Sequence, residues 1–89
     1  MPTHFYDRLV KLRDLLDEEL IKRKRPGFFK ISEQGEGHMF YYSSLSGEDL
    51  STELKDQLME QALLRFASID PFGYVDFMIS VIGKDIYII

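Results

Sequence analysis

Four consecutive cations stand at residues 22–25, in the stretch KRKRPGFF. Lysine and arginine clusters bind phosphate groups, and the phenylalanines that follow could stack on nucleic-acid bases. The same run also suits a helix end, because cations complement the negative end of the helix dipole and a Pro-Gly pair stops the helix. The candidate phosphate-binding residues are Lys22, Arg23, Lys24, Arg25 and Lys30, and the alternative interpretation is a solvated helix end.

Four carboxylates recur further along the chain at helical spacing. They follow i, i+4, i+7 and i+11, which places all four within an arc of about 60° at 100° per residue. Like charges this close on a helix are mildly unfavourable. The simplest interpretation is a solvated outer face, and the functional one is a contact for a basic partner protein that normally receives nucleic acid. This acidic stripe consists of Asp49, Glu53, Asp56 and Glu60.

Aromatic and apolar side chains exceed what a sheet with one buried face requires. In MFYY at 39–42 and IYII at 86–89, both alternating sets of side chains are apolar or aromatic. A terminal strand that is apolar on both faces can be a central strand, a strand covered by a loop, or part of a contact with a second copy or another protein. The candidate residues for a partner or dimer contact are Phe28, Tyr41, Tyr42, Tyr74, Met78 and Tyr87.

Residue groupings typical of catalysis or metal binding are missing from the sequence. The chain has no cysteine, so it has no thiolate nucleophile and no cysteine-based metal site. Neither His4 nor His38 has a second histidine at ligand spacing. The GEG at 35–37 precedes a predicted strand, whereas a phosphate-binding glycine loop precedes a helix. We therefore predict a non-enzymatic protein with no cofactor and no metal.

The charge balance sets the basic run apart from the rest of the protein. The sequence has 11 basic and 15 acidic residues, a net charge of −4, and without residues 22–25 the balance is 7 against 15. An acidic body repels nucleic acid, which ranks nucleic-acid binding below protein binding. Because the sequence shows neither a secretory signal nor an apolar run of about 18 residues, we expect a cytoplasmic protein without a membrane span.

The first half of the chain contains the signals of a helix followed by a hairpin. A helix is predicted from about residue 3 to residue 24, since one narrow stripe of its surface is apolar. That stripe consists of Phe5, Leu9, Leu12, Leu16 and Leu20. GFFKIS and HMFYYSS, joined by the glycine-containing EQGEG, predict a hairpin over about residues 28–44.

A second helix is predicted over about residues 47–67, with Ser46 as its N-cap. Asp49 would be the acidic residue at the third helical position, which is typical of a capping box. Leu45 and Leu50 occupy the two positions of a hydrophobic staple across the helix start.

The last part of the chain predicts a second hairpin, over about residues 74–89. DPFG at 70–73 has the residue order of a type I turn. YVDFMISV alternates after it, with one face made of Val75, Phe77, Ile79 and Val81. The whole chain, 1–89, is thus expected to be one α+β domain of order α-β-β-α-β-β. Its four-stranded, mainly antiparallel sheet would have both helices packed on one face.

The leading functional hypothesis is a small protein-binding regulator or inhibitor that presents the acidic stripe to a basic partner protein. The aromatic sheet surface would contact that partner or a second copy in a homodimer. The alternative is a nucleic-acid-binding module that uses the basic helix end and the aromatic hairpin. The sequence leaves the identity of the partner and the oligomeric state open.

Overall fold

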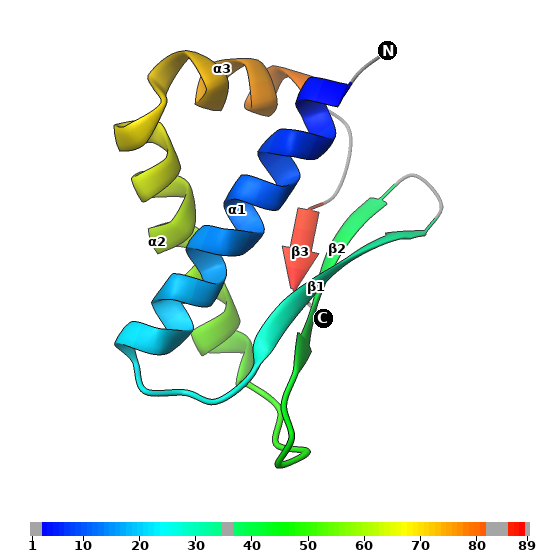
Figure 1. Cartoon of the computed structure of the whole chain (residues 1–89), viewed down its shortest axis with the longest axis vertical. Helices are drawn as coiled ribbons and strands as arrows, with labels where there is room; N and C mark the ends of the chain where they lie inside the picture. The colour runs from blue at the N-terminus through cyan, green and yellow to red at the C-terminus, as the bar shows by residue number, and fades with distance from the viewer. Residues whose placement is uncertain (1–2, 35–36, 82–85, 89) are drawn as a thin grey trace.

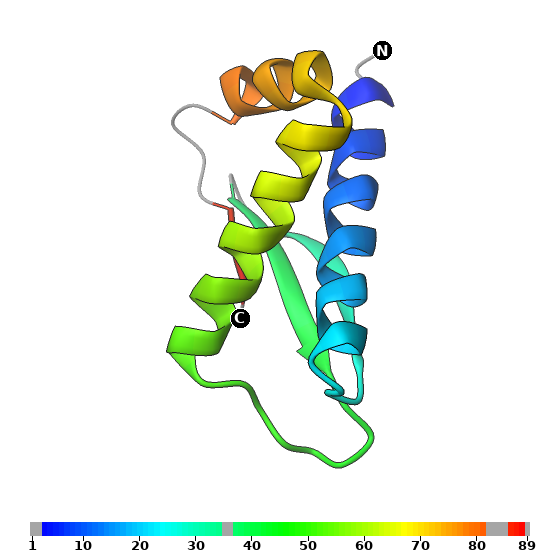
Figure 2. The same ribbon diagram turned by 90° about the vertical axis from the view of Figure 1, so that its left-hand side faces the viewer.

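A computed structural model of the 89-residue chain describes the backbone of residues 3–34, 37–81 and 86–88 and the side chains of residues 5–31, 40–81 and 88. In chain order, the described elements are α1 (Thr3–Lys22), β1 (Phe28–Gln34), β2 (Gly37–Ser43), α2 (Thr52–Ile69), α3 (Pro71–Ser80) and β3 (Ile86–Ile88). Helices α1 and α2 lie side by side on one side of the sheet (Figure 1). Helix α3 lies across the end of that pair where α1 begins and α2 ends (Figure 2).

The predicted four-stranded, mainly antiparallel sheet is wrong, although the protein remains α+β. Strands β1 and β2 form the predicted antiparallel hairpin, with Phe29 opposite Tyr42, and its connecting residues 35–36 lie outside the described ones. Strand β3 pairs with β2 in parallel, and the described strands are ordered β1-β2-β3. Among the described strands, the terminal strand is therefore at the edge of the sheet and not in the central position that its two-sided apolar pattern allowed.

The segment predicted to start the second hairpin is helix α3. Asp70 is its N-cap: the Asp70 carboxylate accepts a hydrogen bond of 3.0 Å from the Gly73 N–H, and Pro71 follows in the first turn. Asp-Pro is favoured both at a helix start and in a type I turn. The same two residues that predicted a turn therefore begin a helix in the structure. The other predicted turn, at 82–85, lies outside the described residues.

Burial along α3 follows the helical period and not the predicted alternation. Phe77 is fully buried, while Val75 and Ile79, predicted to share its face, are 56% and 61% exposed. The Phe77 ring lies 5.5 Å from that of Phe5 and 5.7 Å from that of Phe66, between centroids. The Phe77 side chain thus packs α3 against both α1 and α2.

The core lies between the helices and the inner face of the sheet. The predicted apolar stripe of α1 is confirmed, because its four leucines are fully buried and Phe5 packs against the same cluster. The fully buried residues from the remaining elements are Phe29, Phe40, Leu58, Ala62, Phe66 and Phe77, to which Leu50 adds a nearly buried side chain before α2.

Helix α2 begins later than predicted, because Ser51 and not Ser46 is its N-cap. The Ser51 hydroxyl accepts a hydrogen bond of 3.1 Å from the Leu54 N–H. Ser46 is instead part of the preceding loop, where its hydroxyl lies 2.8 Å from that of Ser44. Leu45 is fully exposed, so the predicted hydrophobic staple is wrong.

Helix α1 ends in a Schellman motif. The Lys24 N–H donates to the Ile21 carbonyl at 3.0 Å, and the Arg25 N–H donates to the Leu20 carbonyl at 2.9 Å. This arrangement requires a left-handed residue, and Lys24 takes that position with φ 56°. Gly27 then allows β1 to approach β2, because its φ is 113° and a Cβ atom there would lie 2.4 Å from a backbone oxygen.

Candidate functional site

An exposed apolar stripe runs along α3. Phe72, Val75 and Ile79 follow i, i+3, i+7 spacing, which places them within an arc of about 60°. Their exposed fractions are 90%, 56% and 61%, whereas Gly73 and Phe77 on the other side are buried. We call Phe72, Val75 and Ile79 the α3 stripe. The sequence pattern does not reveal the stripe, because alternation predicts a strand with Val75 and Ile79 on its buried face.

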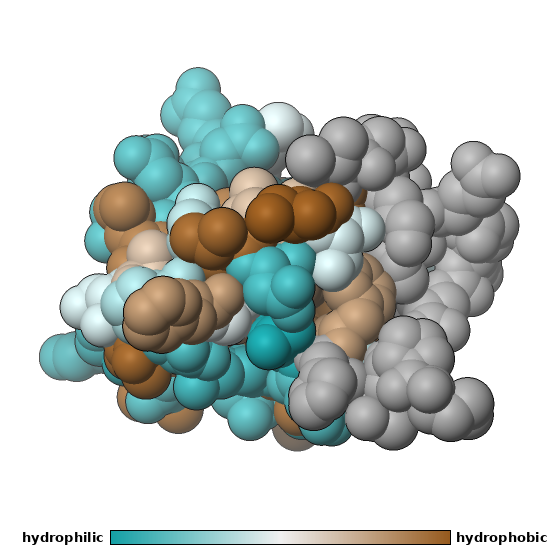
Figure 3. Space-filling model, turned by 90° about the horizontal axis from the view of Figure 1, so that it is seen from above, coloured by the Kyte–Doolittle hydropathy of each residue, from teal (hydrophilic) through white to brown (hydrophobic). Residues whose placement is uncertain are grey.

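The α3 stripe belongs to a larger apolar area at this end of the molecule. Ile69, the last residue of α2, is 55% exposed and precedes the stripe in the chain. Viewed from this end, hydrophobic side chains gather in a band with hydrophilic ones on both sides (Figure 3). Single exposed apolar residues are ordinary, whereas larger apolar patches are typical of interaction surfaces.

The only charged residue of α3 is Asp76, which lies beside the stripe. The Asp76 carboxylate accepts a hydrogen bond from the guanidinium of Arg8 on α1. This ion pair joins α1 to α3 and neutralises the charge next to the apolar surface.

The predicted acidic stripe loses one of its four members. Asp49 lies before α2, where its carboxylate accepts a 2.8 Å hydrogen bond from the Leu50 N–H and lies 3.4 Å from the Lys55 ammonium. The backbone hydrogen bond, with a further contribution from Lys55, lowers the pKa of Asp49. The remaining three carboxylates are exposed on α2 and make no ion pair with any described residue. We call this set the acidic face: Glu53, Asp56 and Glu60.

Two members of the basic run form ion pairs with a carboxylate near the end of α1. The Lys22 Nζ lies 3.2 Å from Glu19 Oε2, and the Arg23 Nη1 lies 2.9 Å from Glu19 Oε1. Lys24 and Arg25 are exposed and are the two members of the run without an ion pair among the described residues.

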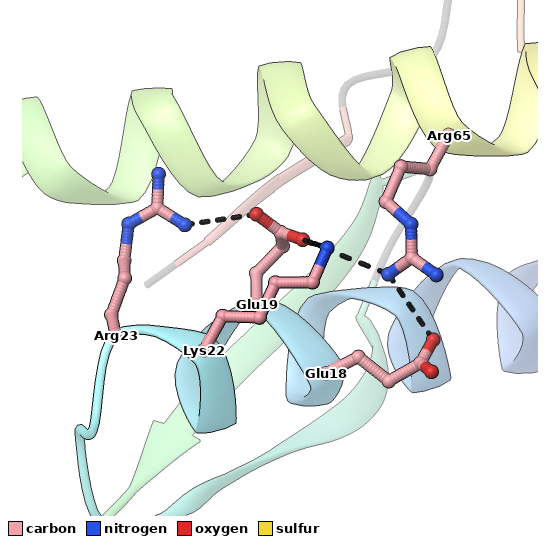
Figure 4. Close-up of polar contacts among 5 residues, drawn as sticks. All are labelled: Glu18, Glu19, Lys22, Arg23 and Arg65. Carbon is pink, nitrogen blue, oxygen red and sulfur yellow. Dashed lines mark hydrogen bonds and ion pairs between the residues drawn. The ribbon is translucent and has the colours of Figure 1, made fainter.

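Glu19 is the centre of a polar cluster between α1 and α2 (Figure 4). Its side chain is almost fully buried, and Arg65 of α2 lies 3.6 Å from Glu19 Oε2 and 3.3 Å from Glu18 Oε2. Burial would raise the pKa of Glu19, but the hydrogen bond from Arg23 and the charges of Lys22 and Arg23 outweigh it and lower that pKa. Glu19 Oε2 accepts no hydrogen bond from a described residue, so it depends on the surrounding cations. The cluster stabilises the α1–α2 contact.

Replacing Lys24 by glycine should stabilise the protein by about 0.5–1 kcal/mol, because glycine takes the left-handed conformation without the steric cost of a Cβ atom. The measurement is the midpoint of urea unfolding. Arg25→Gly is the matched control, since Arg25 does not have positive φ and its replacement should not stabilise. A loss of stability in Lys24→Gly would contradict the Schellman ending.

The sheet residues predicted to form a contact do not share one surface. Phe28 is 46% exposed on the outer sheet face, where the Lys30 ammonium lies 5.5 Å from its ring centroid, and Tyr41 pairs with Lys30 across the hairpin. The Tyr42 hydroxyl donates to the Pro26 carbonyl, and the Tyr42 ring packs toward the core.

The remaining predicted contact residues lie elsewhere. Tyr74 and Met78 are on α3 and pack partly buried against the core, so their assignment to an outer sheet face is wrong. The Tyr74 ring contacts that of Phe66 edge-on, with centroids 6.0 Å apart. The Tyr87 backbone pairs with Met39, and its side chain lies outside the described ones.

An open depression of about 410 Å³ lies between the end of β2 and the following loop. Its lining residues are Tyr41, Tyr42, Ser43, Ser44, Gly47, Glu48 and Asp49. Asp49 and Tyr42 both make hydrogen bonds within the chain, as described above. The depression is therefore lined partly by exposed polar groups and partly by side chains that already form hydrogen bonds within the chain.

Among the described residues, no group of three or more His, Cys, Asp or Glu side chains could hold a metal ion. The side chains of His4 and His38 lie outside that set. The helices that the structure describes include none with the length and apolar character to cross a membrane. A comparison of the chain with protein-family models, characterised proteins and solved structures finds no match.

Proposed function

We propose that this chain is a non-enzymatic, cytoplasmic protein-binding regulator that acts through the α3 end of the molecule and the acidic face of α2. The observation that supports this function most directly is the α3 stripe, because three large apolar side chains on one line are left in solvent by a helix whose opposite side is buried. Apolar groups of this kind are typical of protein-interaction sites.

The acidic face would make the proposed contact selective for a positively charged protein surface. Glu53, Asp56 and Glu60 are exposed and lack ion-pair partners within the described chain, so their charge is available to a basic protein surface. Exposed charges mainly set the association rate and the salt dependence of a complex. Inhibition of a nucleic-acid-binding partner, with carboxylates in the place of phosphates, is one form that such regulation would take.

The alternative, a nucleic-acid-binding module, has weaker support. Lys22 and Arg23 are engaged with Glu19, which leaves Lys24, Arg25 and Lys30 as its cations. Phe28 and Tyr41 would supply the stacking surface. With a net charge of −4 for the whole chain, long-range attraction to phosphate is also absent.

The test is retention of proteins from nuclease-treated lysate by the immobilised chain. Three forms are compared with wild type: Phe72→Gln/Val75→Gln/Ile79→Gln, Glu53→Gln/Asp56→Asn/Glu60→Gln, and the control Ile21→Gln. Glutamine preserves helix propensity. The stripe variant should lose about tenfold or more of a specifically retained protein, and the acidic-face variant should weaken its retention and flatten the salt dependence.

Ile21 is a matched control because it is 74% exposed on the end of α1 that lies away from α3 (Figure 1). Its replacement should leave retention unchanged. Retention that persists in both the stripe and acidic-face variants would contradict the proposed function. Association that nuclease abolishes would favour the nucleic-acid alternative instead.

A further inference from the structure

We infer that the α3 stripe binds a second copy of this chain, in an antiparallel pairing of two α3 helices about a two-fold axis near Val75. This inference rests on the proposed function, because it names the protein that the stripe contacts. It assigns to α3 the self-association that the sequence suggested for the sheet. The acidic face would then remain free for a different, basic partner.

The spacing of the stripe is self-complementary. A two-fold axis between positions 75 and 76 brings Phe72 of one copy to Ile79 of the other and sets the two Val75 side chains against each other. Phe72 and Ile79 are seven residues apart, or about 10 Å along the helix, so both ends can pack in one short helix–helix contact. An isologous dimer requires such a self-complementary patch.

The charges on the molecule favour this location for a second copy. Asp76, the only ionised residue of α3, is paired with Arg8, so two stripes can meet without two unpaired like charges. The acidic face has three unpaired carboxylates, and its first member lies at the end of α2 remote from α3 (Figure 1). Two acidic faces would repel each other, which disfavours self-association through α2.

The available apolar area predicts a weak dimer. Four side chains, Ile69 with the three stripe residues, are each more than half exposed. Together they offer on the order of 400 Å² per protomer, judged against about 150–250 Å² for one whole aromatic side chain. A standard interface uses about 800 Å² per partner, so we expect a dissociation constant on the order of 0.1 mM.

Sedimentation equilibrium of the purified full chain tests the inference. Most chains should be monomeric at about 10 µM and dimeric at about 1 mM. The Phe72→Gln/Val75→Gln/Ile79→Gln variant should weaken the dimer at least about tenfold, whereas Ile21→Gln should match wild type. A wild-type monomer at 1 mM, or a dimer that the stripe variant leaves intact, would overturn the inference.

Single cysteines test the antiparallel geometry, because the chain contains no cysteine of its own. Val75→Cys should form a disulfide-linked dimer under mild oxidation, since residues at the two-fold axis approach within the short Cβ separation that a disulfide needs. A mixture of Phe72→Cys and Ile79→Cys should cross-link to each other faster than either does to itself. Ile21→Cys is the control. Equal cross-linking of Ile21→Cys and Val75→Cys would overturn the pairing.

The outcomes separate this inference from the proposed function. A monomer at 1 mM whose stripe still retains another protein from lysate would overturn the dimer and leave the proposed function intact. A stripe-dependent dimer whose acidic face retains no protein would support the dimer and contradict the proposed regulatory contact.

Discussion

Replacing Phe77 by alanine should destabilise the protein by about 3–5 kcal/mol, the usual effect of removing a fully buried phenylalanine. The side chain is inaccessible to solvent, stacks on the ring of Phe5 and packs at a tilt against the ring of Phe66. A small domain has only about 5–15 kcal/mol of total stability, so the variant should lose a large part of it. The free energy of unfolding in urea gives the measurement.

Phe72→Ala is the matched control, because it removes the same side chain from the same helix at a position that is 90% exposed. Its effect should be within about 0.5 kcal/mol, and Ile79→Ala should also be nearly neutral. A strand would place Ile79 on the face of Phe77 and make both replacements costly. A large loss in Ile79→Ala as well as in Phe77→Ala would therefore contradict α3.

Replacing Glu19 by alanine should destabilise the protein by about 2–3 kcal/mol, because the cations around it lose their buried carboxylate partner. The expected effect is below that of a fully buried ion pair, since Lys22, Arg23 and Arg65 are partly exposed. Glu18→Ala is the control: the Glu18 side chain is 53% exposed, and its loss should cost less than about 1 kcal/mol. Equal effects of the two replacements would contradict the cluster.

The stability that Glu19 contributes should also depend on pH. Its pKa is lower in the folded than in the unfolded state, so the unfolded chain binds the proton first as the pH falls. The contribution is complete above the ordinary pKa, 4.5, and is lost as the pH falls through the lowered folded-state value. Wild type should thus lose more stability than Glu19→Gln on acidification through this window, as urea unfolding at successive pH values would measure.

Asp17 contributes to the same pH profile with the opposite sign. Its carboxylate accepts a 2.8 Å hydrogen bond from the Phe29 N–H, and burial raises its pKa in the folded state. Its protonation therefore favours folding as the pH falls. The comparison with Glu19→Gln isolates Glu19, because Asp17 is the same in both proteins. Identical acid profiles for wild type and Glu19→Gln would contradict the assigned role of the Glu19 carboxylate.

Helix α1 and the hairpin were predictable because their signals are local and agree with one another. The stripe from Leu9 to Leu20 fits only the helical period, and the Pro26-Gly27 pair marks the end of the helix. The structure buries Phe29 and leaves Phe28 46% exposed, in keeping with the alternation of side chains along a strand. In these segments a single conformation satisfies both the turn residues and the apolar pattern.

The start of α2 and the whole of α3 were not predictable from local signals. Ser46 and Ser51 are both plausible N-caps, and the choice of Ser51 removes Asp49 from the predicted acidic stripe. In YVDFMISV only Asp76 and Ser80 are clearly polar, so its apolar residues fit a period of two as well as 3.6. The length of the segment does not decide between strand and helix.

The sequence by itself therefore determined the α+β character, α1, the hairpin and the separation of acidic from basic residues along the chain. Only the tertiary structure decided that residues 71–80 form a helix, and the reason is the packing of one side chain. As a helix, the segment places Phe77 against Phe5 and Phe66. Phe72, Val75 and Ile79 then remain exposed. That choice created the α3 stripe, and with it the surface on which the proposed function depends.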